Sequence, residues 1–215
     1  MDVEVWSDVI CPWCYIGKRR LESALRGFEH ADAVQVIWRS FELDPDAPAR
    51  ATGNLEEMLA AKYGLDRAAA RAANARVTQL AAAEGLEYHL EVARPGNTFD
   101  AHRLLHLASA RGLQAELKER MLGAYFTAGA AIGDPDTLLR LGAEAGLDLP
   151  EARRVLGSDA YAEEVRADER EAAALGADGV PFFVLNRAYG VSGAQASAVL
   201  LEALREAWAA RHQEP

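Results

Sequence analysis

The chain has 215 residues, of which 50% are hydrophobic and 26% charged, as in an ordinary globular protein. Its net charge of −10 argues against sequence-independent binding to nucleic acid or to an anionic membrane, because neutralising phosphates needs a basic surface. No apolar stretch is long enough to span a bilayer, and the first residues carry acids where a secretory leader would carry bases. We therefore expect a cytoplasmic protein that binds neither nucleic acid nor membrane.

The first block of predicted elements alternates strand and helix. A strand at residues 3–6 precedes a helix that begins near Pro12, a residue favoured at the first helical position, and ends near Phe28. A second strand at residues 34–38 and a loop at residues 39–48 follow. This order predicts two parallel strands joined by a crossover helix.

The rest of the chain is first helical and then returns to strands. The helices, separated by breaks at Gly, Pro and Asn, are predicted at residues 54–63, 66–84, 98–111, 113–128, 135–145, 150–157 and 159–176. Strands at residues 180–185 and 188–191 flank a two-residue turn at Asn186-Arg187, and a helix at residues 194–210 follows.

Together the blocks predict an α/β fold, in which neither outer part has enough strands to close a core alone. We expect a core domain of residues 1–50 and 177–215, built on a mixed four-stranded sheet with helices on both faces. Residues 51–176 would form a large, mainly helical insertion that includes the helix leading back to the core.

Cys11 and Cys14, the only cysteines of the chain, are separated by Pro12 and Trp13 at the predicted helix start. Unpaired backbone N–H groups and the helix dipole favour a thiolate there, and the i, i+3 spacing suits a disulfide. Cys14 shares the apolar stripe of the helix and should face the core, whereas Cys11 should sit at the exposed tip. We therefore expect Cys11 to attack and Cys14 to resolve, with no cofactor, because the disulfide itself carries two electrons.

Two other interpretations of the cysteines are open: an incidental pair and half of a zinc site. A zinc site needs about four ligands, and the chain has no second Cys pair. His102 and His106 have the i, i+4 spacing that metal ligands on a helix can have, but no third ligand is evident. Solvated or capping histidines are the favoured interpretation, and we expect no metal. Lys18, Arg19 and Arg20 are interpreted as a solvated helix face.

Five segments carry a resemblance to a known family: residues 7–17 (SDVICPWCYIG), 38–43 (WRSFEL), 97–103 (NTFDAHR), 179–184 (GVPFFV) and 191–195 (VSGAQ). In these the chain resembles the DsbA-like branch of the thioredoxin superfamily, most closely the FrnE-like cytoplasmic proteins. The resemblance implies a thioredoxin fold with a helical insertion and thiol–disulfide oxidoreductase activity. The buried acid that many thioredoxins carry on the first strand would fall at about Val5, which is not an acid here; Asp8 is the acid just before the cysteine motif.

The resemblance also implies a substrate site. Pro181 would be a cis-proline that faces the cysteines, and the backbone of Val180 would pair with an extended substrate segment. Asn97, Thr98 and His102 would lie where the insertion overhangs the thiols, and Trp13, Tyr15 and Phe99 either line the same groove or pack in the core. The expected substrate-binding residues are Pro12, Trp13, Val180, Pro181, Asn97, Thr98 and His102.

The expected partner is a thiol or disulfide of a protein or small molecule, glutathione included; the oligomeric state is open, a dimer being one option. A second hypothesis is an enzyme like the kappa-class glutathione transferases and hydroxychromene-carboxylate isomerases. Those enzymes typically have Ser where this chain has Cys11, which disfavours that hypothesis. A third is a chaperone-like binding protein that uses the insertion.

Overall fold

The computed structural model describes residues 1–49 and 54–211, which form two compact units. The first unit joins Met1–Leu43 to the chain from Asp168 onward, and the second comprises Asp44–Ala167. The boundary expected between residues 50 and 51 lies outside the described residues. The expected bounds of the core domain and of the insertion therefore stay a prediction.

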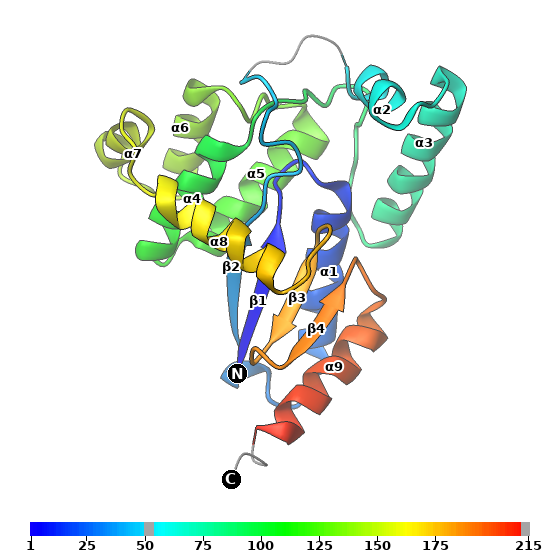
Figure 1. Cartoon of the computed structure of the whole chain (residues 1–215), viewed down its shortest axis with the longest axis vertical. Helices are drawn as coiled ribbons and strands as arrows, with labels where there is room; N and C mark the ends of the chain where they lie inside the picture. Colours follow the sequence, from blue (N-terminus) through cyan, green and yellow to red (C-terminus); the bar gives the residue numbers. More distant parts are fainter. Residues whose placement is uncertain (50–53, 212–215) are drawn as a thin grey trace. The chain divides into compact units, whose positions relative to one another are not determined.

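The first unit is built on a four-stranded sheet with the order β2-β1-β3-β4 (Figure 1). Its strands are β1 (Asp2–Ser7), β2 (Gln35–Ser40), β3 (Phe182–Leu185) and β4 (Tyr189–Ser192). β1 is parallel to β2 and antiparallel to β3, and β3 and β4 form an antiparallel hairpin. The predicted α/β class and mixed four-stranded sheet are confirmed.

The hairpin between β3 and β4 turns where the sequence predicted. Asn186 and Arg187 have φ angles of +49° and +55°, and the N–H of Ala188 donates to the carbonyl of Leu185 at 3.0 Å. Two successive residues with positive φ match the right-handed twist of the flanking strands.

Helices cover both faces of this sheet. α1 (Pro12–Arg26) and α9 (Ser197–Ala210) pack on one face, because Val3 and Val5 point to that side of β1 (Figure 1). The buried core there consists of Val3, Val5, Leu21, Ala24, Phe28, Trp38, Phe183, Leu185, Leu200, Leu204 and Ala207. On the other face Ala172 of α8 (Ala162–Ala174) packs against Trp6, Phe182 and Val184.

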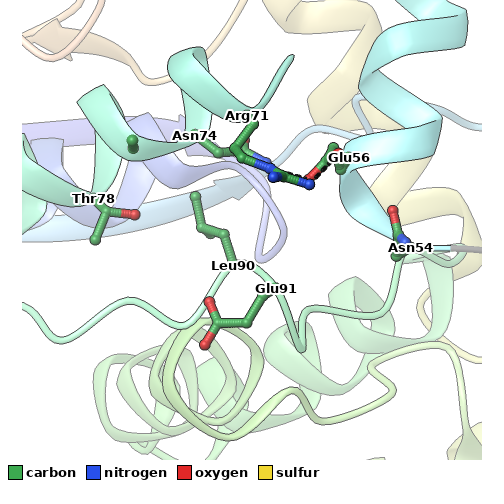
Figure 2. A pocket seen from close by; sticks show the side chains of 8 residues that line it. Asn54, Glu56, Arg71, Asn74, Thr78, Leu90 and Glu91 are labelled. Carbon is green, nitrogen blue, oxygen red and sulfur yellow. Dashed lines mark hydrogen bonds and ion pairs between the residues drawn. The ribbon is translucent and has the colours of Figure 1, made fainter. Parts of the chain in front are cut away.

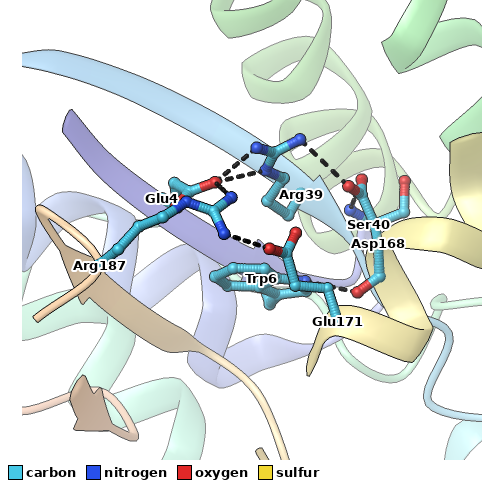
Figure 3. A network of polar contacts seen from close by, with 7 residues as sticks. All are labelled: Glu4, Trp6, Arg39, Ser40, Asp168, Glu171 and Arg187. Atoms are coloured by element: carbon cyan, nitrogen blue, oxygen red, sulfur yellow. Dashed lines mark hydrogen bonds and ion pairs between the residues drawn. The ribbon is translucent and has the colours of Figure 1, made fainter. Parts of the chain in front are cut away.

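A buried polar network lies beside this second apolar cluster (Figure 3). The carboxylate of Glu4 is 3% exposed and accepts hydrogen bonds from Arg39 Nε at 2.9 Å and from Arg187 at 3.0 Å. Arg39 also donates to Asp168 at 3.3 Å. Burial acts to lower the pKa of Arg39, but the hydrogen bond that Arg39 donates to Glu4 and the charge of Asp168 outweigh it and raise that pKa.

Asp168 ties α8 to the sheet through three contacts. Its carboxylate accepts from the Ser40 N–H at 2.8 Å and from Arg39, and its carbonyl accepts from the Trp6 indole N–H at 2.8 Å. The network therefore joins β1, β2, α8 and the β3–β4 turn.

The second unit is helical. Its helices are α2 (Leu55–Tyr63), α3 (Arg67–Ala83), α4 (Phe99–Ala110), α5 (Gln114–Ala128), α6 (Pro135–Glu144) and α7 (Leu149–Leu156). Side chains of Asn54, Asp66, Asp134 and Asp148 cap the N-termini of α2, α3, α6 and α7. α2 pairs with α3, and α4 packs against α5, α6 and α7. In the part of the chain that the structure describes, no helix has the length and apolar character needed to cross a membrane.

We predict that Asp168→Ala lowers the free energy of unfolding by about 2–4 kcal/mol, because it removes the buried acceptor of the Ser40 N–H and one partner of Arg39. Urea unfolding followed by circular dichroism measures the change. Glu29→Ala is the matched control: it breaks an exposed ion pair with Arg205 and should leave the midpoint nearly unchanged. Equal midpoints for Asp168→Ala and the native protein would contradict the role given to the network.

Candidate functional site

The two cysteines lie at the start of α1, in the first unit. Cys11 is the N-cap residue, with the extended φ and ψ of −86° and 115° that such residues adopt, and Pro12 begins the helix as predicted. The Cys14 N–H donates to the Cys11 carbonyl at 3.0 Å, and the two cysteines are not joined by a disulfide. The positive end of the helix dipole favours an anion here. The first turn contains no acidic residue whose negative charge would offset it.

The sulfur of Cys11 contacts a segment far along the chain. Its thiol donates to the carbonyl oxygen of Val180 at an Sγ–O distance of 3.5 Å. The peptide bond that follows, between Val180 and Pro181, is cis. The structure thus brings Cys11, Cys14, Val180 and Pro181 together, while Trp13 between the cysteines is 39% exposed.

The expected difference in exposure between the two sulfurs is wrong. Cys11 is 3% exposed and Cys14 1% exposed, so both are buried. Cys14 is inside the first turn of α1, as its place on the apolar stripe predicted. Cys11 is buried as well because the Val180 carbonyl lies against its sulfur. The sulfurs therefore differ in their contacts and in their place on the helix.

Two further hydrogen bonds, which were not predicted from the sequence, hold the Pro181 loop and the segment after β4. The Pro181 carbonyl accepts from the Gly193 N–H at 2.8 Å, and Arg20 of α1 donates to the Ala194 carbonyl at 2.6 Å. Gly193 has a φ of +77°, which glycine adopts without strain. A glycine directly after a short strand is the signal of this turn that the sequence offers. The sequence does not show that the N–H of this glycine bonds to the Pro181 carbonyl.

The basic cluster of α1 is not a simple solvated face. Lys18 is 6% exposed and pairs with Glu22, and Arg19 donates to Glu22 at 2.8 Å and to the Tyr15 hydroxyl oxygen at 3.2 Å. Arg20 holds the Ala194 carbonyl. These three basic side chains therefore make ion pairs and hydrogen bonds within the first unit.

Asp8, the acid nearest to the thiols in sequence, is fully buried. Its carboxylate accepts from the Leu43 N–H at 2.8 Å, and its carbonyl lies 3.4 Å from the Cys11 N–H that donates to it. Asp8 thus joins the segment after β2 to the segment that leads into α1.

The remaining predicted site residues lie together at the start of α4, in the second unit. Thr98 is its N-cap residue, and the Asn97 side chain accepts from the Phe99 N–H at 2.9 Å and donates to the Pro45 carbonyl at 3.1 Å. The expectation of a solvated His102 is wrong, since the residue is 1% exposed. The reason is that α4 packs against several helices, which bury more of its surface than one apolar stripe. A substrate-binding role for these residues stays a prediction.

Within the described ranges, no group of three or more His, Cys, Asp and Glu side chains could hold a metal ion. The second unit has a polar cavity of about 410 Å³ (Figure 2). It is lined by Asn54, Glu56, Arg71, Asn74, Ala75, Thr78, Leu90 and Glu91. Arg71 pairs there with Glu56 at 3.4 Å, so the cavity offers charged and hydrogen-bonding groups but no thiol.

Comparisons with known proteins show the family of the chain. The family described as the DSBA-like thioredoxin domain matches residues 2–205. The solved structure of a probable DsbA oxidoreductase from Streptomyces coelicolor is 51% identical, with a TM-score of 0.94, and the match covers 97% of this chain and 90% of that chain.

Two distant structures show likeness of fold alone. The cytosolic disulfide reductase DsbM from Pseudomonas aeruginosa, also solved with GSH, is 19% identical with a TM-score of 0.61. A 2-hydroxychromene-2-carboxylate isomerase is 16% identical with a TM-score of 0.70. Each match covers 99% of this chain and 98% of the other.

The family match runs from the first strand into the last helix and includes the thiol pair, the Val180–Pro181 loop and the helical middle of the chain. The predicted thioredoxin-like fold with a large helical insertion is confirmed. The chain belongs to the DSBA-like thioredoxin domain family.

Proposed function

We propose that the protein is a thiol–disulfide oxidoreductase that works through Cys11 and Cys14, as the FrnE-like proteins it resembles are expected to do. The observation that carries the proposal is the contact of the Cys11 thiol, at the start of α1, with the Val180 carbonyl. A helix N-terminus favours the thiolate that such chemistry requires. Membership of an oxidoreductase family supports the same activity.

The reaction has two steps. The Cys11 thiolate attacks one sulfur of a substrate disulfide, the substrate S–S bond breaks, and the leaving thiolate takes up a proton. Cys14 then loses its proton and attacks the Cys11 sulfur; the Cys11–substrate S–S bond breaks, the second substrate thiolate leaves and takes up a proton, and the Cys11–Cys14 disulfide closes. The substrate gains two electrons and two protons, and the protein loses them; the reverse sequence oxidises a dithiol. The disulfide carries the electrons, so no cofactor takes part.

Val180 and Pro181 would position the substrate. The Val180 carbonyl lies against the attacking sulfur, and an extended segment pairing with this backbone would bring its disulfide to Cys11. Pro12 fixes the start of the helix, and the exposed Trp13 offers an apolar contact beside the sulfur. We also propose a substrate-binding role for Asn97, Thr98 and His102 of the second unit.

We infer a cytoplasmic protein whose partners include low-molecular-weight thiols such as glutathione. Support comes from the cytosolic disulfide reductase of Pseudomonas aeruginosa, whose structure was also solved with GSH. In a reducing compartment a lone Cys pair is more often catalytic than structural.

An isomerase or glutathione transferase is the competing function, because a 2-hydroxychromene-2-carboxylate isomerase has a similar fold. That function would not need two thiols at one helix start. Glutathione-dependent isomerisation retained in Cys14→Ser would favour it over disulfide exchange.

We predict that Cys11→Ser lowers the rate of insulin disulfide reduction at least about a hundredfold, because a serine hydroxyl is a far poorer nucleophile than a thiolate. The turbidity of the released insulin chains measures the rate, with Ser109→Ala on the exposed end of α4 as the control. Turnover near the native rate in Cys11→Ser would reject the assignment of the nucleophile.

We predict that Cys14→Ser accumulates a mixed disulfide, because the thiol that would release the substrate is gone. After reaction with oxidised glutathione, intact-protein mass spectrometry should find one glutathionyl group, and peptide mapping should place it on Cys11. The native protein should release the adduct and close its own disulfide. An adduct that is equally long-lived in both proteins would show that Cys14 does not resolve it.

A further inference from the structure

The absence of a side chain at Gly17 has a steric cause. Gly17 is buried in α1, one turn after Cys14. A Cβ atom added there would lie 2.8 Å from Pro181 Cγ and 3.3 Å from Phe183 Cζ. Carbon atoms in a packed interior lie about 3.5–4.0 Å apart, so the residue leaves no room for even a methyl group.

Helix propensity would favour a side chain at this position. Alanine is the best helix former and glycine one of the poorest, so a buried glycine in the middle of a helix needs another reason. The close approach of the Pro181 ring supplies that reason.

Neither neighbour of Gly17 can yield easily. Pro181 is a rigid ring whose carbonyl is held by the Gly193 N–H at 2.8 Å. Phe183 is fully buried in β3, where it pairs with Val5 on one side and Val191 on the other. A methyl group at position 17 would therefore displace the loop that contains Val180 and Pro181.

We propose that Gly17 is a positioning residue. Its missing side chain lets α1 and the Pro181 ring meet, and this contact sets the distance between the Cys11 sulfur and the Val180 carbonyl. The effect on turnover rests on the proposed function, whereas the effect on the Cys11 contact does not. Gly17 itself touches neither sulfur nor substrate; it acts through Pro181.

Displacing the Val180 carbonyl should shift the equilibrium between dithiol and disulfide in one direction. The Cys11 sulfur donates to the Val180 carbonyl only as the protonated thiol of the reduced form, because neither the thiolate nor the disulfide has an S–H. Displacing the carbonyl removes a contact that stabilises the dithiol alone. In Gly17→Ala, the equilibrium between dithiol and disulfide in a glutathione buffer should move toward the disulfide by about threefold. The kcat/KM for disulfide reduction should fall by about ten- to a hundredfold, because the substrate backbone pairs with a displaced loop.

The matched control is Gly27→Ala at the other end of α1. There the added Cβ would lie 3.4 Å from Leu201 Cδ2, the end of a flexible side chain, and the glycine φ is −93°. This variant should keep the native equilibrium and the native kcat/KM. A folding defect in Gly17→Ala would lower the active fraction but leave the equilibrium constant of the folded protein unchanged. Native values of both quantities in folded Gly17→Ala would overturn the proposal.

A second test uses Pro181→Ala, which lacks the Cγ atom that causes the overlap. Adding Gly17→Ala in this background should change the equilibrium, or the folding, much less than it does in the native chain. Equal effects in the two backgrounds would overturn the proposal. Native protein that does not reduce disulfides would reject the proposed function alone, since the equilibrium shift in Gly17→Ala can still be measured.

Discussion

The contact between the Cys11 sulfur and the Val180 carbonyl is the interaction on which the rest of the site depends. It follows from the order of the strands. β1 and β3 are antiparallel neighbours with Trp6 opposite Phe182, so the end of β1 and the start of β3 lie at the same edge of the sheet. The segment after β1 leads to Cys11 and the segment before β3 contains Val180, which brings residues 169 positions apart into contact.

The two faces of the sheet serve this contact in different ways. On the apolar face, α1 packs through Leu21 and Ala24 and carries both thiols at its N-terminus. On the other face, the network around Glu4 and Asp168 joins α8 to β1 and β2 (Figure 3). Both arrangements hold β1 in place, and β1 leads directly into the segment with the thiols.

Local signals in the sequence were enough for the elements and for the position of the thiols. Pro12 marked the start of α1, and Asn186 and Arg187 marked the hairpin turn. Because side chains alternate along a strand, Glu4 of β1 lies on the face opposite Val3 and Val5. The sequence pattern shows this alternation. It could not reveal that α8 also covers that face, nor that Arg39 and Arg187 come from distant segments to neutralise the buried carboxylate.

Burial depends on contacts between elements, and there the sequence was less informative. Cys11 was expected to be exposed because it precedes the helix, yet a loop 169 residues away covers its sulfur. His102 was expected to be solvated because a single apolar stripe was assumed for α4, yet α4 packs against three helices and His102 is buried. The conformation at Pro181 was implied only by the family resemblance, because a Val-Pro sequence by itself favours the trans form.

The most direct test of the account is the redox equilibrium of the native protein in glutathione buffers of graded potential, followed by acid quenching and intact mass. We expect one transition between a dithiol and an internal Cys11–Cys14 disulfide. A midpoint near about −270 mV would indicate a reductase and one near about −120 mV an oxidant. Two thiols that stay open to alkylation at every potential, or that collect glutathione without closing on each other, would contradict it.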